Sequence, residues 1–181
     1  MKRFQLQVGN GVVMRLRHPA DAEAVFHLVK KNEAFLGQWL SWANDTNTPD
    51  DSLKHIEKAL KDFKDGTSLE LGIFLNNEFI GMVGFHTITK NYAEIGCWLS
   101  KDCNQQGIMT QCVKKLMQYA FRYRKIHRIV AKIDTENLRS NAIPKRIGCT
   151  LEGVERESQH LNGMYRSMQV WSFLKTDKFL I

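Results

Sequence analysis

The residues best suited to ligand chemistry lie in a short polar turn between an apolar strand and a helix. The turn contains Gly107, follows the apolar run 93–99, and precedes a helical period of apolar residues that begins at Ile108. The N–H groups that open a helix lack intrahelical partners and sit at its positive end, so phosphate groups bind there. No acidic residue lies between Asp102 and Asp134, so no carboxylate on the helix would repel an anion. Taken alone, the stretch fits a phosphate site and an ordinary connection equally well.

Two carboxylates within apolar strands are candidates for acid–base chemistry. Glu70 lies in the run SLELGIFL, where alternation places it on one face with Gly72 and places the leucines and the isoleucine opposite. Glu94 lies near the start of the run 93–99. Composition alone favours a solvent-facing strand residue at Glu70. His86, at the end of another apolar strand, is more often structural.

Composition sets limits on the class of protein. The 181 residues are 43% hydrophobic, which predicts one domain spanning 1–181. The net charge of +7 suits an anionic ligand or an acidic partner, but the basic residues are dispersed and no nucleic-acid motif accompanies them. We expect no membrane span and no signal peptide. The cysteines form no CxxC pair, which predicts packed free thiols in a reducing cytoplasm and no metal site; they are Cys97, Cys103, Cys112 and Cys149.

Periodicity predicts alternating strands and helices. Strands are expected at 12–17, 68–75, 79–87, 92–99, 128–134, 150–156 and 164–174. Helices are expected from Pro19, at 34–42, at 51–64, at 108–124 and within 137–147, with a loop at 44–52. The strand–helix–strand unit 93–134 implies a parallel pair. The predicted fold is therefore α/β (α+β): a mixed, mostly antiparallel twisted sheet with one central parallel strand pair and helices on both faces.

Two tryptophans in the expected helix 34–42 allow two interpretations. Trp39 and Trp42 lie close together beside a polar, turn-rich segment. Burial in the core is the safer prediction. The alternative is that they wall a substrate groove, as large aromatic side chains near loops often do.

Four stretches in order carry a family resemblance: AEIGCWL, NQQGIMTQCVKKLMQYAF, DTENLRSNAIPKRIGCTLEG and HLNGMYRSMQVWSFLK. With the helical first third, they make the sequence resemble GNAT-superfamily N-acetyltransferases over nearly its whole length. Within that superfamily it is similar to the ribosomal-protein N-terminal (serine/alanine) acetyltransferases. The resemblance implies acetyl-coenzyme A as cosubstrate and no metal. It also implies that the pyrophosphate lies on the turn before the long helix and that the acetyl-bearing arm lies where two parallel strands splay apart.

The resemblance assigns the cofactor contacts residue by residue. They are Cys97, Trp98, Leu99, Asn104, Gln105, Gln106, Gly107, Ile108, Met109, Thr110, Asn137 and Ser140. A backbone N–H from the 97–99 edge is implied as the oxyanion donor. The turn departs from the family pattern because only its central Gly107 is kept, and Gln105 replaces a residue that is frequently Gly. Backbone binding tolerates such changes if the required φ and ψ remain reachable.

The same resemblance implies the catalytic residues Ser140 and Glu70. Many superfamily members protonate the leaving thiolate with a Tyr seven residues after Asn137, where this chain has Pro144. The ribosomal-protein group resembles this chain at Ser140, whose hydroxyl is the candidate for that role; the alternative is a plain helix N-cap. Relatives carry an acid in the strand of Glu70, which becomes the candidate base, directly or through a water relay, with Glu94 second.

The implied acceptor is a protein N-terminal α-amine, with an acidic ribosomal protein as the partner that the basic charge would attract. Two alternatives stay open: a small-molecule amine (polyamine, amino acid or antibiotic), and a non-catalytic family member that binds coenzyme A or a partner protein. A homodimer paired through the C-terminal hairpin is a further option. The expected location is the cytoplasm, and nucleic acid is not an expected partner.

Overall fold

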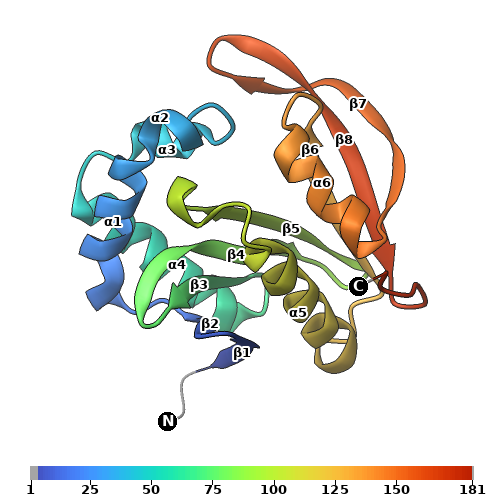
Figure 1. Cartoon of the computed structure of the whole chain (residues 1–181), viewed down its shortest axis with the longest axis horizontal. Helices are drawn as coiled ribbons and strands as arrows, with labels where there is room; N and C mark the ends of the chain where they lie inside the picture. Colours follow the sequence, from blue (N-terminus) through green and yellow to red (C-terminus); the bar gives the residue numbers. More distant parts are fainter. Residues whose placement is uncertain (1–3, 181) are drawn as a thin grey trace.

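A computed structural model describes residues 4–180, which form an open, twisted sheet flanked by helices (Figure 1). The sheet order is β1-β2-β3-β4-β5-β6-β8-β7. Its strands are β1 (Gln5–Gly9), β2 (Val12–Leu16), β3 (Leu69–Leu75), β4 (Glu78–Ile88), β5 (Tyr92–Leu99), β6 (Arg128–Asp134), β7 (Thr150–Leu161) and β8 (Met164–Leu174). The pair β5–β6 is parallel, and the other neighbouring strands pair antiparallel. The predicted fold class is confirmed.

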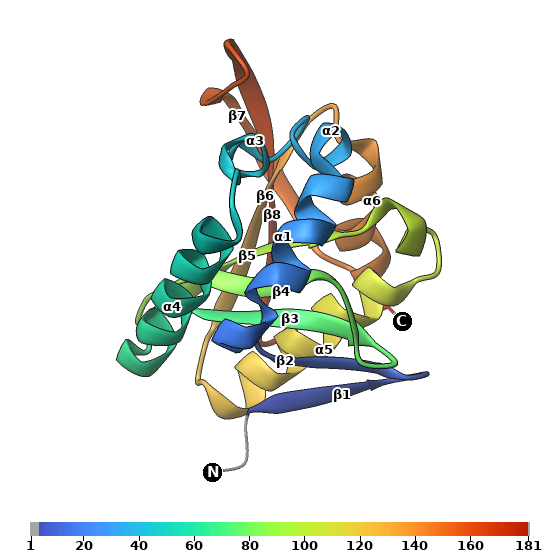
Figure 2. The same cartoon turned by 90° about the vertical axis from the view of Figure 1, so that its left-hand side faces the viewer.

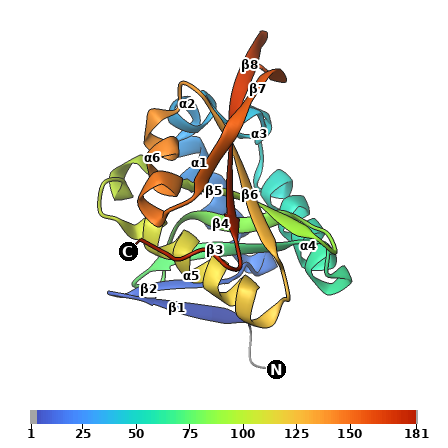
Figure 3. The same cartoon turned by 90° about the vertical axis from the view of Figure 1, so that its right-hand side faces the viewer.

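Helices cover both faces of this sheet. They are α1 (Ala22–Lys31), α2 (Glu33–Leu36), α3 (Ser41–Asp45), α4 (Pro49–Asp65), α5 (Ile108–Tyr123) and α6 (Leu138–Ile147). Helices α1 and α4 pack on one face (Figure 2), whereas α5 packs on the other with α6 beside it (Figure 3). Within residues 4–180, no helix combines the length and the apolar character needed to cross a membrane.

Three element predictions were wrong. Val12–Leu16 is the second strand rather than the first, because the alternating, half-exposed segment Gln5–Gly9 pairs with it at the sheet edge. The expected helix 34–42 is divided into α2 and α3 by a turn that follows Gly37. The expected loop 44–52 contains the start of α4, because Thr48 and Asp51 form a capping box around Pro49.

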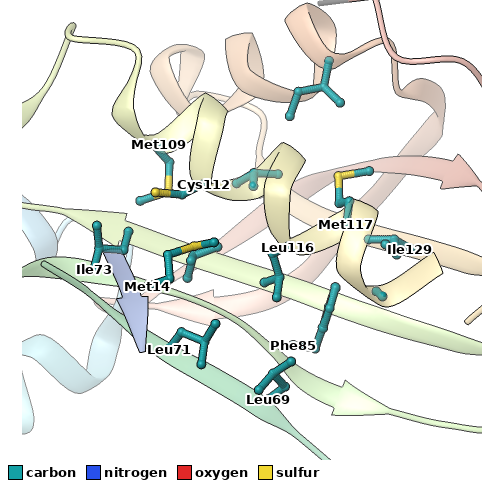
Figure 4. Close-up of a cluster of buried hydrophobic side chains, with 14 of the residues drawn as sticks. Met14, Leu69, Leu71, Ile73, Phe85, Met109, Cys112, Leu116, Met117 and Ile129 are labelled. Carbon is teal, nitrogen blue, oxygen red and sulfur yellow. The ribbon is translucent and has the colours of Figure 1, made fainter. Parts of the chain in front are cut away.

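The main core lies between the sheet and α5. Leu116 and Cys112 of the helix are fully buried against Phe85, Leu71 and Ile73 of the sheet (Figure 4). Each fully buried side chain of this size stabilises the fold by about 1.5–3 kcal/mol. This packing fixes the direction of α5, and therefore the place where its N-terminus points.

The opposite face of the sheet is less completely filled. A smaller cluster joins Val29 of α1 and Ile56 of α4 to Phe74, Phe79 and Trp98. The rest of this face carries polar side chains and glycines, which line a cavity.

The parallel strands β5 and β6 separate soon after they meet. Their pairing covers only 92–94 against 128–130, although β5 continues to Leu99 and β6 to Asp134. Beyond Glu94, β5 therefore has no hydrogen-bonded neighbour on that side, and a gap opens in the middle of the sheet.

Candidate functional site

A cavity of about 1440 Å³ occupies the gap and reaches both faces of the sheet. Its lining includes Met109 of α5 and Ser140 of α6 at one side, and His55 of α4 and Glu70 of β3 at the other. We call the region of residues 104–110 the α5 end. We call the region formed by Arg17, His55, Glu70, Gly84 and Gly96 the Glu70 end.

The structure brings together most of the residues predicted to bind a cofactor. The cavity is lined by Cys97, Trp98, Leu99, Asn104, Met109, Asn137 and Ser140. The remaining predicted residues form the turn and first helical positions adjoining Asn104 without lining the cavity themselves; they are Gln105, Gln106, Gly107, Ile108 and Thr110.

Backbone groups rather than side chains are what the α5 end offers to a ligand. Gly107 is the N-cap with φ +74°, and no side chain caps the helix. The side chains that follow it, from Ile108 to Thr110, are buried in the core. Gln105 also adopts a left-handed φ of +64°. The first N–H groups of α5 therefore remain available to an anion, as at other helix N-termini.

Charges around the α5 end favour an anion. Arg146 of α6 donates through Nη1 to Thr110 Oγ1 at 2.9 Å, which places a guanidinium beside the start of α5. Asp102, the nearest preceding acid, pairs with Lys31 Nζ at 2.7 Å. A Cβ at Gly107 would meet only Gln111 Nε2 at 3.9 Å, so the turn is open to close approach. These features fit a bound diphosphate. Arg146 was missed because its contact with Thr110 depends on the packing of α6 against α5.

The edge of β5 turns polar backbone groups into the gap. Ser100 N donates to Ile80 O at 2.8 Å. In the antiparallel β4–β5 ladder, every second residue of β5, counted from Ser100, therefore points its backbone N–H and C=O toward β4. That alternation leaves the N–H and C=O groups of Cys97 and Leu99 facing away from β4. Desolvation raises the pKa of the Cys97 thiol to about 12, so the thiol is a packing group rather than a nucleophile. All four cysteines are free, as predicted.

At the start of α6 the helix cap is Asn137. Its Oδ1 accepts a hydrogen bond from Ser140 N at 3.1 Å, so the alternative prediction of Ser140 as N-cap was wrong. Ser140 lies in the first turn and lines the cavity. Pro144 follows inside the helix, where it offers no N–H to the carbonyl of Ser140.

At the Glu70 end, one carboxylate oxygen joins two basic groups. Glu70 Oε2 accepts from Arg17 Nη2 at 3.1 Å and contacts His55 Nε2 at 3.0 Å. Burial raises the pKa of Glu70, but the hydrogen bond from His55 and the charges of His55 and Arg17 outweigh it and hold the pKa below its usual range. Burial lowers the pKa of Arg17, against the charge of Glu70. Neither basic partner was predicted from the sequence, because Arg17 and His55 come from distant segments and carry no local signal.

Glycines form a bare floor beside Glu70. Glu70 of β3 is in register with Gly84 of β4, which is in register with Gly96 of β5. A Cβ at Gly84 would lie 2.6 Å from both Leu69 O and Glu70 Cα, so only glycine fits there. The absence of side chains at two successive strands leaves a groove that runs from Glu70 toward the gap.

A second carboxylate and two aromatic side chains complete this side of the cavity. Glu94 Oε1 lies 3.4 Å from His86 Nε2, and this hydrogen bond lowers the pKa of Glu94 against the effect of burial.

Trp39 and Trp42 both line the cavity, and neither is buried. The safer prediction, core tryptophans, was therefore wrong; both side chains wall the cavity, and their contact with a substrate stays a prediction. Within residues 4–180, no three His, Cys, Asp or Glu side chains cluster to hold a metal ion.

The chain is similar to known acetyltransferases over most of its length. The family model described as Acetyltransferase (GNAT) domain matches residues 12–150. A Bacillus subtilis (strain 168) protein, YdaF, provisionally named a ribosomal N-acetyltransferase, is 31% identical over 96% of this chain and 97% of its own length. The ribosomal-protein-serine acetyltransferase of Escherichia coli (strain K12) is 28% identical over 82% of this chain and 84% of its own.

Solved structures share the fold. RimL, a ribosomal L7/L12 alpha-N-protein acetyltransferase in complex with coenzyme A, superimposes with a TM-score of 0.92 at 30% identity, covering 96% of this chain and 100% of that one. The microcin C7 self-immunity acetyltransferase MccE, in complex with acetyl-CoA and AMP, gives a TM-score of 0.90 at 29% identity, with 93% and 95% covered.

Proposed function

Because this chain belongs to the GNAT acetyltransferase family, we propose that it transfers the acetyl group of acetyl-coenzyme A directly to a primary amine. One observation carries the proposal: a single cavity joins the uncapped N-terminus of α5, the polar edge of β5 in the gap and the carboxylate of Glu70. Direct transfer requires these three parts in one space.

At the α5 end, the N–H groups that follow Gly107 and the guanidinium of Arg146 would hold the pyrophosphate. Asn137 and Ser140 would border the arm, because both line the cavity beside the gap. When bound, acetyl-coenzyme A supplies a thioester, which is an activated acetyl donor. The departure of the turn from the family pattern is compatible with this role, because its side chains are not the donors.

Three groups of the chain would serve the transfer. The Cys97 and Leu99 N–H groups face the gap, where they stabilise negative charge that develops on a carbonyl oxygen. The Ser140 hydroxyl donates a hydrogen bond to the departing sulfur. Glu70, with Glu94 as the second candidate, forms the basic side of the site, where a proton leaves the ammonium to a carboxylate or to a group that the carboxylate positions.

The acceptor we favour is the α-amine of a protein N-terminus, on a ribosomal protein in the cytoplasm. The names of the relatives support this class of acceptor. The formal charge of +7 would attract an acidic protein. The edge strand β7 exposes Leu151 and Val154, which supports a homodimer formed through the C-terminal hairpin.

A small-molecule amine is the second candidate acceptor. It is favoured by the likeness to MccE, whose structure is a complex with acetyl-CoA and AMP. A panel of α-amino peptides, polyamines, amino acids and aminoglycosides, assayed for thiol release and product mass, separates the two classes. A binding protein without catalysis would release no thiol with any of them.

Calorimetric titration with acetyl-coenzyme A tests the proposal itself. We expect saturable binding, and no binding at millimolar concentration would contradict it. Ser140→Ala should lower turnover while leaving the Kd for acetyl-coenzyme A unchanged. Wild-type turnover in this variant would remove Ser140 from the transfer.

A further inference from the structure

Arg17, Glu70 and His55 form a chain along the wall of the cavity, from its buried part toward solvent. Arg17 Nη2 and His55 Nε2 both contact Glu70 Oε2, at 3.1 and 3.0 Å. The exposed fractions of the three side chains rise along the chain, from 1% for Arg17 through 17% for Glu70 to 52% for His55. His55 is thus the member of the chain that a ligand and solvent can reach.

The partners of Glu70 make it a poor proton acceptor. Its carboxylate is fixed by an ion pair with a buried guanidinium, and, against the effect of burial, the hydrogen bond from His55 and the charge of Arg17 hold its pKa below the usual range. An imidazole is the side chain best suited to exchange protons at physiological pH. When ionised Glu70 accepts a hydrogen bond from His55 Nε2–H, the neutral ring keeps its lone pair on Nδ1.

We propose that His55 Nδ1 takes the proton from the acceptor amine, with Glu70 and Arg17 as positioning residues; this inference rests on the proposed function. One N–H bond of the ammonium breaks and an Nδ1–H bond forms. The nitrogen of the acceptor gains the lone pair needed for attack, and His55 becomes an imidazolium. The carboxylate of Glu70 offsets the new positive charge, and the proton then passes to water, because half of the side chain is exposed.

The neighbouring charged groups single out His55. Asp51, one turn earlier on α4, is engaged by the Thr48 cap. His86 of β4 pairs with Glu94 at a longer distance of 3.4 Å. Glu70 has a buried guanidinium that holds its orientation. The His55–Glu70 pair is therefore the shorter of these two histidine–carboxylate pairs, and its carboxylate has a further buried partner.

Kinetics with an octapeptide bearing a free N-terminal serine test the assignment. His55→Ala should lower kcat/KM at pH 7 by about 100-fold or more, the scale of general-base catalysis, with unchanged Kd for acetyl-coenzyme A. Added imidazole should restore part of the rate. The deficit should shrink above about pH 8, where an α-amine loses its proton unaided. The matched control is His27→Ala, an exposed helical histidine on α1 that does not line the cavity; it should keep full activity.

Two results would overturn the assignment. Full activity of His55→Ala beside an inactive Glu70→Gln would transfer the role to Glu70. Nitrogen-15 NMR of the ring gives a readout that needs no acceptor: we expect the proton of neutral His55 on Nε2, with this preference lost in Glu70→Gln. A proton on Nδ1 would contradict the proposal. If the wild type acetylates no amine, the proposed function fails, and the NMR measurement still decides the geometry.

Discussion

The two ends of the cavity present different kinds of chemical group to a ligand. At the α5 end, the groups offered to a ligand are backbone N–H groups, and the neighbouring side chains from Ile108 to Thr110 are buried in the core. At the Glu70 end, the functional groups are the side chains of Arg17, Glu70 and His55, and the backbone serves as a bare floor. The α5 end should therefore depend on φ and ψ and tolerate changes of side chain. The Glu70 end should depend on the identity of each side chain.

The strongest test of this difference is Glu70→Ala. The substitution leaves the buried charge of Arg17 without its partner, which typically destabilises a fold by about 3–5 kcal/mol. Urea denaturation of the purified protein measures this loss. The control is the double variant Arg17→Met with Glu70→Gln, which removes both charges and should recover much of the stability. Equal losses in the two variants would show that the ion pair is not the cause.

A side chain added at the glycines beside Glu70 should have a large effect on activity. Gly96→Val should lower kcat/KM for an α-amino peptide by about 100-fold, because displacing a reacting group by about 1 Å can have that effect. A Cβ at Gly96 would meet only the His86 ring, 3.3 Å from Nδ1, so the fold should survive. Binding of acetyl-coenzyme A should persist in calorimetry. Gly84→Ala is the contrasting variant: its Cβ would strike backbone atoms, so it should lower the melting temperature. An active Gly96→Val enzyme would remove the groove from the acceptor path.

The backbone at the α5 end gives a smaller expected effect. Gly107→Val places a branched residue at φ +74°, which strains the turn by about 1–3 kcal/mol. Relaxation of this strain would move the N–H groups, so we expect the Kd for acetyl-coenzyme A to rise by about tenfold, equivalent to about 1.4 kcal/mol. Gly66→Val provides the control, because Gly66 has a similar φ of +77° at the end of α4. It should show the same strain with unchanged affinity. An unaltered Kd in Gly107→Val would argue against the turn as the anchor.

The smallest expected effect is at Gln105. Its left-handed φ of +64° is unfavourable for a residue with a Cβ. Gln105→Gly should therefore raise the free energy of unfolding by about 0.5–1 kcal/mol, after the greater flexibility of glycine in the unfolded chain is subtracted. The Kd for acetyl-coenzyme A should stay within about twofold. A tenfold rise would mean that the side chain of Gln105 itself contacts the ligand.

The α5 end could be predicted from the sequence more fully than the Glu70 end. The change of period around Ile108 and the apolar run 93–99 predicted β5, the turn and α5, because strand and helix periodicities are local signals. The face occupied by Glu70 followed from simple alternation. The edge strand Gln5–Gly9 was missed, because three of its five positions are exposed, none is buried, and its pairing is set by β2.

The polar partners at the site lay beyond local patterns. His55 is an exposed residue on a surface helix, and Arg17 immediately follows β2. Their common contact, Glu70, lies in a third element. Such groupings depend on how the elements pack, and packing is decided by the core rather than by the site itself. The capping role of Asn137, and the exclusion of Ser140 from it, likewise required atomic positions.

The tip of the β7–β8 hairpin is hydrogen-bonded to the α2–α3 segment. Asn162 donates to Gly37 O at 2.8 Å and accepts from Asn44 Nδ2 at 3.3 Å. These contacts bridge two segments whose neighbouring residues, among them Trp39 and Leu161, line the cavity. The two walls of the cavity that these segments form are therefore tied to each other and would move together, so that a change in the position of one wall is passed to the other.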